Sequence, residues 1–144
     1  MTQSHYKNIL DFHEKFQVPL ANSPTLLSGE TLKFRIDFLQ EELNELKKAH
    51  VENNLEEAFD ALLDLAVVLY GTAQFMGFSE EAWNEGFAEV HRANMSKVRA
   101  TDASQSKRGT SLDVVKPEGW QAPNHTPIIE KYLSNYEHID NSFS

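Results

Sequence analysis

The sequence predicts an all-α protein built as a four-helix bundle, followed by a loop segment and a short extra helix. Up to about Ala100, apolar residues recur at spacings of three and four, capping residues and glycines separate these stretches, and strands do not alternate with helices. A chain of 144 residues has the length of one domain. We therefore expect one domain over residues 1–136 and a tail over residues 137–144.

The first two helices are predicted by their apolar stripes. Residues 4–16 place their apolar side chains near one side of a helix, and Pro19 ends it. In residues 29–50 the apolar positions form the stripe of an amphipathic helix: Leu32, Ile36, Leu39, Leu43 and Leu46.

The third and fourth helices are predicted by their ends. Asn54 and Glu57 have the form of a capping box, in which both residues satisfy free backbone amides, so the third helix begins there. Gly77 can adopt the left-handed conformation that closes a helix. Ser79 then caps the fourth helix, which we expect to continue through Arg99.

After Ala100 the chain is rich in Thr, Ser, Gly, Asp and Lys and is interrupted by prolines, so a loop or a small hairpin is expected. Thr126 and Pro127 can open the short last helix, which ends near Tyr136.

Composition excludes several classes of protein. Thirteen Lys and Arg against 22 Asp and Glu give a net charge of −9, which argues against coating of nucleic acid. The absence of cysteine excludes disulfide frameworks, zinc ribbons and thiol catalysis. The N-terminus lacks a signal segment, and the longest apolar run, residues 65–70, is too short to cross a bilayer. We expect a soluble, cytoplasmic protein with no nucleic-acid or membrane partner.

Carboxylates on the second and third helices are the candidate metal ligands. Glu41, Glu42 and Glu45 fall within one turn on one side of the second helix, although acidic faces of this kind are often simply solvated. Asp64 interrupts an apolar run and needs a partner, and Asp60 lies one turn earlier on the same face. A cation between the two aspartates, or one buried arginine, would offset their repulsion.

Facing helices with the patterns EExxE and DxxxD offer hard oxygen ligands, which suit Mg²⁺, or Mn²⁺, better than zinc or copper. A ferritin-like iron site would need Glu-x-x-His pairs, and no histidine here has Glu three positions before it. The chain also lacks GxxxxGKS/T and GxGxxG loops, so a bound nucleotide would have to be held through metal.

From Arg92 to Lys116 the sign of the charge reverses. Six of the 13 basic residues lie in this stretch, Lys107 among them, against two aspartates. An acidic metal site followed by a basic loop suits a polyphosphate, although a basic loop that only offsets an acidic bundle would look the same.

These residues resemble the MazG-like superfamily of all-α nucleoside triphosphate pyrophosphohydrolases. The resemblance rests on the ExxE of Glu42 and Glu45, on the acidic helix that follows, on EVHRANMSK at 89–97 and on KPEGW at 116–120. The resemblance covers residues 32–120. Within the superfamily, the chain resembles the branch with dUTPase-type activity and the phosphoribosyl-ATP pyrophosphohydrolase-like proteins.

The resemblance implies a MazG fold, hydrolysis between the α- and β-phosphates, and an assembly into homodimers or homotetramers. Glu42, Glu45 and Asp64 would hold Mg²⁺, and Glu41 would be a further ligand or the base that activates water. Asn94 and Lys97 match the NxxK of the family and would contact the nucleotide, a role that we extend to Lys107 and Lys116.

One departure concerns the third helix, where the ExxD of the family would place Glu at position 61 and this chain has Ala61. Asp60 can substitute from the next position, or Glu57 and Asp60 can form the ExxD one turn earlier; we prefer Asp60 with Asp64. Phe34 and Phe38 lie on the glutamate side and are candidates for stacking a base, although aromatics at this spacing are more often core.

The leading hypothesis is a Mg²⁺-dependent hydrolase of a nucleoside triphosphate, with a pyrimidine substrate such as dUTP or dCTP favoured by the resemblance. The alternatives are a phosphoribosyl-ATP pyrophosphohydrolase and a non-catalytic helical oligomerisation module, which the missing Glu at position 61 would favour.

Overall fold

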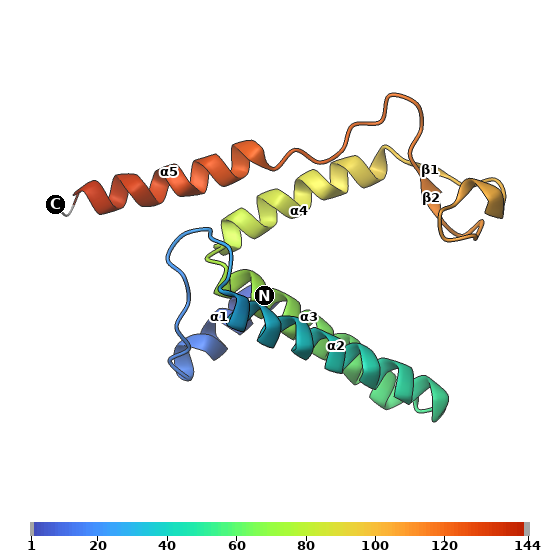
Figure 1. The fold of residues 1–144 in the computed structure, drawn as a ribbon, viewed down its shortest axis with the longest axis horizontal. Helices are drawn as coiled ribbons and strands as arrows, with labels where there is room; N and C mark the ends of the chain where they lie inside the picture. Colours follow the sequence, from blue (N-terminus) through green and yellow to red (C-terminus); the bar gives the residue numbers. More distant parts are fainter. Residues whose placement is uncertain (1, 143–144) are drawn as a thin grey trace. The chain divides into compact units, whose positions relative to one another are not determined.

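The computed structural model describes residues 2–142, with side chains to residue 134. It has α1 (His5–Lys15), α2 (Gly29–Val51), α3 (Leu55–Phe75), α4 (Glu80–Met95) and α5 (Thr126–Ser142), with the short 3-10 helix η1 at Ala103–Gln105. The only strands in this range are β1 (Val98–Arg99) and β2 (Val114–Val115), which form an antiparallel pair. The all-α prediction is confirmed (Figure 1).

The chain divides into two compact units. The first includes the residues up to Glu80 and those from Tyr132 onward, and the second extends from Glu81 to Lys131. The predicted acidic site lies in the first unit, and the predicted basic residues lie in the second.

In the first unit, α3 is the central helix. It packs along α2 and also contacts α1. Small side chains are buried in these helices, including Ala49 of α2 and Ala58 and Ala61 of α3. Small residues allow two helix backbones to approach each other closely, so the carboxylates beside them are brought near the facing helix.

Polar contacts fasten α1 to α3. The His13 Nδ1 and Gln74 Oε1 atoms are 2.8 Å apart, and both side chains are buried. Gln74 Nε2 donates to the carbonyl of Tyr6 at 2.9 Å, so its oxygen is the acceptor for His13, and the imidazole proton lies on Nδ1. The Tyr6 hydroxyl donates to the carbonyl of Phe78 at 2.6 Å.

The ends of α3 agree with the capping predictions, with one correction. The Asn54 side chain accepts a hydrogen bond from the amide of Glu57, as expected. The amide of Asn54, however, donates to the carbonyl of Ala49 and closes α2, so Glu57 does not complete a capping box. At the other end, Gly77 has φ +82, and the amides of Gly77 and Phe78 donate to the carbonyls of Gln74 and Ala73.

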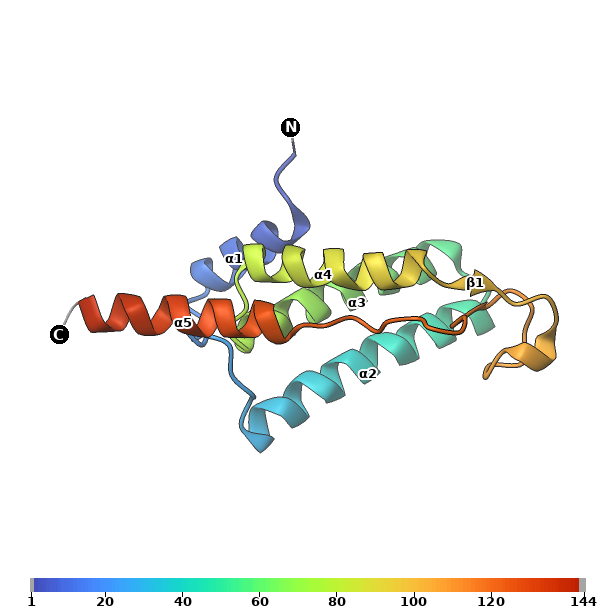
Figure 2. The ribbon, with the colours of Figure 1, turned by 90° about the horizontal axis from the view of Figure 1, so that it is seen from above.

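The second unit corrects the predicted length of the fourth helix. The helix ends at Met95 instead of Arg99, because Val98 and Arg99 pair with the second strand. The predicted small hairpin is therefore present but begins earlier than Ala100, and Figure 2 shows β1 following directly from α4. The last helix is longer than expected and extends to Ser142.

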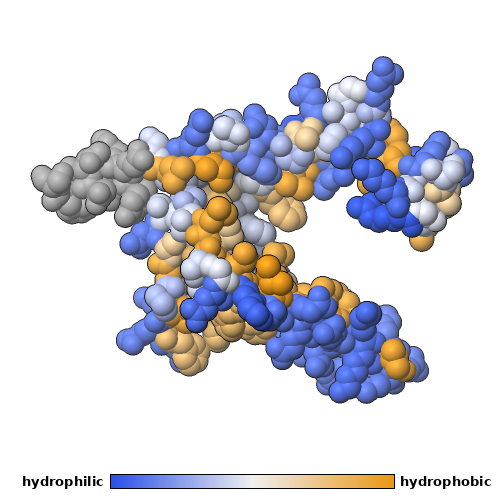
Figure 3. All heavy atoms as spheres, in the orientation of Figure 1, coloured by the Kyte–Doolittle hydropathy of each residue, from blue (hydrophilic) through white to orange (hydrophobic). Residues whose placement is uncertain are grey.

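The first unit exposes much apolar surface, which Figure 3 shows in orange. Among the described residues, α3 is long and apolar enough to cross a membrane by length and composition, a property shared by core helices of soluble proteins. The sequence prediction considered only the uninterrupted apolar run at residues 65–70, which is shorter than this helix. One third of that apolar window is buried within the chain. Large apolar side chains at half exposure or more include Leu55, Phe59 and Leu62.

Candidate functional site

An acidic pocket of about 190 Å³ lies between α2 and α3. It is lined by Glu41, Glu42, Glu45, Glu57, Asp60, Ala61 and Asp64. The structure therefore brings together the carboxylates predicted from the sequence, including Glu57, which was the alternative partner of Asp60. The residues gather because α2 and α3 pack lengthwise and each presents its carboxylates within about one or two turns.

Glu42 and Asp64 are the most enclosed acids of the pocket. Both are half-buried, whereas the other four carboxylate residues are exposed. Burial raises the pKa of Glu42, and the negative charges of Asp64 and its other acidic neighbours raise it further. Burial also raises the pKa of Asp64, followed by the charge of Asp60 and a hydrogen bond between the two carboxyls. The two groups hold their negative charge less readily than an ordinary carboxylate.

In the structure, a buried arginine does not pair with Asp60 or Asp64. A buried arginine is present at Arg35, but its guanidinium donates to the Thr72 hydroxyl and the Val68 carbonyl, each at 3.0 Å. Among the described residues, Asp64 hydrogen-bonds with the carboxyl of Asp60 and forms no ion pair with a basic side chain. The pocket is thus left with an uncompensated negative charge.

Ala61, where the resemblance implies a glutamate, lies inside this pocket. Ala61 is 3% exposed and lines the pocket itself, while Asp60 and Asp64 lie on either side of it in sequence. Glu57, one turn before Ala61, also reaches the pocket. Glu57 was expected to cap α3, and its spacing of three from Asp60 was the sequence signal for a place in the pocket.

The donor set of the pocket fits a hard divalent cation by its chemistry, because all its charged groups are carboxylates that repel one another. Among the side chains that the structure describes, no group of three or more His, Asp or Glu residues lies close enough together to hold a metal ion. The pocket is open to solvent on the side of the exposed glutamates.

Phe34 and Phe38, predicted as candidates for base stacking, have ring centroids 6.1 Å apart. The Arg35 guanidinium lies 5.4 and 5.5 Å from these two rings and 4.7 Å from the ring of Phe75. The two aromatics therefore help to surround a buried cation. Phe34 remains 53% exposed, and base contact stays a prediction.

The predicted basic residues of the second unit lie in different settings. Asn94 is exposed in the last turn of α4, and Lys107 is exposed between η1 and β2. Lys97 and Lys116 meet at one aromatic ring: their Nζ atoms lie 5.4 and 4.9 Å from the ring of Trp120.

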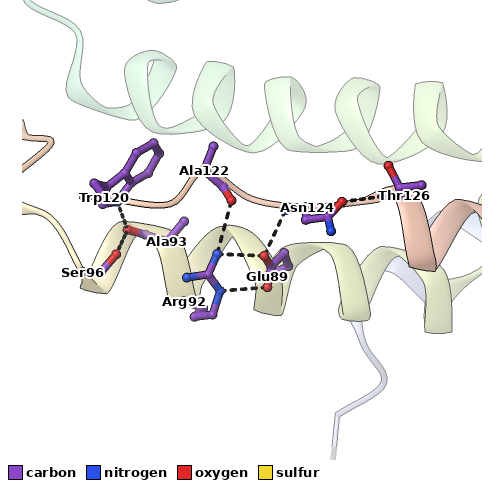
Figure 4. Close-up of polar contacts among 8 residues, drawn as sticks. All are labelled: Glu89, Arg92, Ala93, Ser96, Trp120, Ala122, Asn124 and Thr126. Carbon is purple, nitrogen blue, oxygen red and sulfur yellow. Dashed lines mark hydrogen bonds and ion pairs between the residues drawn. The ribbon is translucent and has the colours of Figure 1, made fainter. Parts of the chain in front are cut away.

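Trp120 was not singled out as a site residue. Its indole Nε1 donates to the carbonyl of Ala93 at 2.8 Å, near the end of α4 (Figure 4). Its backbone amide donates to the carbonyl of Pro117 at 3.1 Å, and Gly119 between them has φ +76, as the third position of a type II turn requires. The KPEGW string was the signal, since Pro and Gly at these positions predict a turn that returns Trp120 toward Lys116.

A second set of contacts fixes the segment after Trp120 along α4. Glu89 accepts two hydrogen bonds from Arg92 and one from the amide of Asn124, and Arg92 also donates to the carbonyl of Ala122 (Figure 4). Hydrogen bonding by Arg92 lowers the pKa of Glu89 to about 2, with further contributions from the Asn124 amide and the charges of Arg92 and His125.

Comparison with known proteins identifies the family. A protein of Acanthamoeba polyphaga mimivirus, described as uncharacterized protein L479, is 44% identical over 112 residues. The aligned region is 77% of this chain, which spans only 40% of the length of that relative. The sequence family described as phosphoribosyl-ATP pyrophosphohydrolase matches residues 9–94, which include both helices of the acidic pocket. The chain belongs to this phosphoribosyl-ATP pyrophosphohydrolase family, part of the MazG-like nucleotide pyrophosphohydrolase superfamily.

Proposed function

We propose that this protein is a Mg²⁺-dependent pyrophosphohydrolase of a nucleoside triphosphate. The observation that carries the proposal is the acidic pocket, in which six carboxylate side chains from two packed helices meet inside the region that matches the family. A pyrimidine deoxynucleotide such as dUTP or dCTP is the substrate that we favour, on the strength of the sequence strings 89–97 and 116–120.

In this proposal Glu42, Glu45, Asp60 and Asp64 hold Mg²⁺, for which Mn²⁺ can substitute. Held by these residues, a divalent cation would neutralise phosphate charge and would lower the pKa of the water bound to it. Burial and the negative charges of neighbouring carboxylates disfavour the charged forms of Glu42 and Asp64. A cation bound in the pocket would offset this electrostatic repulsion.

Glu41 is the proposed general base. It lines the same pocket and is exposed, so it can accept a proton from an attacking water. The water oxygen then bonds to phosphorus, the bridging P–O bond between the α- and β-phosphates breaks, and the products are the monophosphate and pyrophosphate. Asn94, Lys97, Lys107 and Lys116 are the proposed contacts of this chain to the nucleotide.

A second candidate substrate is phosphoribosyl-ATP, because the matching family is described by that activity. The same carboxylate pocket serves either substrate, since both contain an α–β phosphoanhydride. The third reading is a non-catalytic helical module, for which Ala61 in place of glutamate is the supporting feature.

We also propose that the protein acts as a homodimer or homotetramer. Apolar side chains of α3 recur at spacings of three and four, so that one side of the helix presents a continuous stripe: Leu55, Phe59, Leu62, Ala66 and Leu69. Four of these residues are between 47% and 86% exposed in the isolated chain. Contiguous apolar surface of this kind marks an interface, and a second copy covers the same stripe with its own.

Product analysis tests the activity. The protein is incubated with Mg²⁺ and with dNTPs, NTPs and phosphoribosyl-ATP in turn, and pyrophosphate is measured separately from phosphate. We expect pyrophosphate and the monophosphate from a subset of these substrates, and no product in the presence of EDTA. Absence of product with both Mg²⁺ and Mn²⁺ would favour the non-catalytic module.

The variant Glu42→Gln tests the site. Loss of one enclosed carboxylate should lower kcat/KM by about a hundredfold or more while helical circular dichroism is unchanged, because the amide has the same shape but no charge. Glu52→Gln is the matched control, since Glu52 lies on the same helix's C-terminal boundary outside the pocket. Turnover by Glu42→Gln at the rate of the control would refute the assignment of the pocket.

A further inference from the structure

The turn at one end of the α2–α3 pair fixes how closely the two helices lie there. Residues 52–54 join the helices, and Ala49 and Ala58 are buried next to this turn. The acidic pocket follows, and it is lined by residues of the ranges 41–45 on α2 and 57–64 on α3. Beyond the pocket no turn joins α2 to α3, so side-chain contacts must hold the two helices together at that end.

On the far side of the pocket from this turn, the buried guanidinium of Arg35 connects α2 to α3. Its Nε donates to the hydroxyl of Thr72, and its Nη2 donates to the carbonyl of Val68, each at 3.0 Å. The Thr72 hydroxyl donates in turn to the same carbonyl at 2.7 Å. Because the guanidinium is planar and its donors have fixed directions, these bonds set both the distance and the register between the two helices.

The surroundings of Arg35 leave room for its guanidinium and stabilise its charge. A Cβ atom built on Gly71 would lie 2.6 Å from Nη2 of Arg35, so only a glycine leaves the space that the guanidinium occupies. The rings of Phe34, Phe38 and Phe75 have their centroids 5.4, 5.5 and 4.7 Å from the guanidinium and attract it. Burial lowers the pKa of Arg35, but a guanidinium remains charged inside a protein.

The same register brings the two enclosed acids of the pocket together. Arg35 lies seven residues before Glu42, and Gly71 lies seven residues after Asp64. Seven residues are about two helical turns, so the members of each pair lie on one helix face. The charge of Asp64 raises the pKa of Glu42, as expected for carboxylates that approach each other across the interface. A slide or separation of the helices at Arg35 would therefore also displace Glu42 from Asp64.

We propose that Arg35 is a positioning residue for the acidic pocket. By connecting α2 to α3 beyond the pocket, it keeps the carboxylates of the two helices opposite each other, so that both helices contribute ligands to one divalent cation. Burial and acidic neighbours account for the raised pKa values of Glu42 and Asp64, so Arg35 acts on the pocket through geometry and not through its charge. The cation rests on the proposed function, whereas the connection between the helices rests on the contacts of Arg35.

Binding of Mn²⁺ alone, without nucleotide, tests the positioning role. The electron paramagnetic resonance signal of free Mn²⁺ decreases when the ion is bound, so a titration gives the affinity. We expect Arg35→Met to weaken Mn²⁺ binding by about tenfold. Helical circular dichroism should be unchanged, because methionine fits the apolar surroundings and the Val68 carbonyl keeps its bond from Thr72. Arg35→Lys should weaken binding similarly although it keeps the charge, because an ammonium lacks the fixed pair of donors.

Gly71→Ala is a second variant, which retains Arg35 but forces its guanidinium to move. We expect weaker Mn²⁺ binding here as well, although alanine favours a helix more than glycine does. Gly29→Ala is the matched control on α2, since an added Cβ at Gly29 meets nothing within 4 Å, and its Mn²⁺ binding should be unchanged. Wild-type affinity in both Arg35 variants would overturn the positioning role, and so would equal losses in the two glycine variants.

The metal dependence of turnover separates positioning from a general loss of stability. In Arg35→Met the Mn²⁺ concentration that gives half the maximal rate should rise, and saturating Mn²⁺ should restore most of kcat. Tyr6→Phe removes the hydrogen bond from the Tyr6 hydroxyl to the Phe78 carbonyl, which lies outside the α2–α3 pair. It should leave the Mn²⁺ requirement unchanged. A rise of the same size in Tyr6→Phe would show that lost stability, not positioning, explains the effect of Arg35→Met.

The same measurements distinguish this proposal from the proposed activity. Weaker Mn²⁺ binding in the Arg35 variants, with no turnover of any triphosphate by the wild type, would support the positioning role and refute the activity. Turnover by the wild type, with Mn²⁺ binding unchanged in the Arg35 variants, would support the activity and refute the positioning role.

Discussion

At the scale of single residues, Gly77 occupies a position that other residues cannot share. Its φ is +82, and a Cβ atom built there would lie 2.1 Å from the carbonyl oxygen of Ser23. Both the backbone conformation and the close approach of the loop require glycine. The turn after α3 therefore depends on this residue.

We expect Gly77→Ala to lower the free energy of unfolding by about 1–3 kcal/mol, because the alanine must adopt a strained φ and displace the Ser23 backbone. Urea denaturation followed by circular dichroism measures the loss. Gly29→Ala is the control, since an added Cβ at Gly29 meets nothing within 4 Å and should have little effect. Equal stability of the two variants would contradict this account of the turn.

His13 makes stability depend on pH. Burial lowers the pKa of its imidazole, and the nearby positive charge of Arg35 lowers it further, while the hydrogen bond with Gln74 acts in the opposite direction. The unfolded chain therefore binds a proton at a higher pH than the folded chain does. The stabilisation is complete above the ordinary pKa of about 6.5 and is lost as the pH falls from there through the lowered pKa.

Urea unfolding at pH values from about 7.5 down to about 5 tests this sign. We expect the free energy of unfolding to decrease over this range and the decrease to be smaller in His13→Gln, which cannot take up a proton. If the wild type and the variant lose the same free energy between these limits, His13 is not the source of the dependence.

At the scale of elements, the carboxylate of Asp113 stabilises the hairpin that β1 and β2 form. Asp113 accepts hydrogen bonds from the Ser106 hydroxyl and from Arg108, each at 2.7 Å, and from the amide of Val114 at 2.9 Å. The bond from Ser106, then that from Arg108, lowers the pKa of Asp113. The loop between β1 and β2 is thus closed by side-chain contacts at the start of β2.

We expect Asp113→Asn to increase the hydrogen-exchange rates of the loop and of the two strands by at least about threefold, because an amide replaces a charged acceptor of several donors. Mass spectrometry of peptides over 98–115 provides the measurement. Asp102→Asn is the comparison: Asp102 bonds locally to Ser104, so its effect should be confined to η1. Unchanged exchange in Asp113→Asn would show that strand pairing alone holds the hairpin.

At the scale of the whole molecule, the exposed apolar stripe of α3 predicts self-association. Light scattering coupled to size-exclusion chromatography should give a mass of two or four chains, and Leu62→Arg should shift it to that of one chain, because a charge is placed within the stripe. Leu112→Arg is the control, since Leu112 is 81% exposed in a loop of the second unit. A monomeric wild type would refute self-association. The apolar stripe would then be expected to contact another protein or a membrane.

Much of the helical structure was predictable because its causes are local. The apolar spacing of three and four, the cap at Asn54 and the glycine at position 77 each act within a few residues, and the helices begin and end close to where these signals lie. The prediction failed where a distant segment competed: residues 98 and 99 continue the pattern of the fourth helix, but pairing with β2 removes them from it. The expected capping box also failed for this reason, because the amide of Asn54 donates to the carbonyl of Ala49 at the end of α2 and not to Glu57.

The candidate site likewise has residues that local sequence predicts and contacts that only tertiary packing determines. The carboxylates of α2 and α3 were identifiable from the chain alone, because helical periodicity places each set on one face and because an aspartate in an apolar run requires a partner. Only the tertiary structure excluded Arg35 as that partner and brought the ammonium groups of Lys97 and Lys116 to the ring of Trp120. Both outcomes depend on the register between segments distant in sequence, and such a register is set by the packing of whole elements, which no local pattern contains.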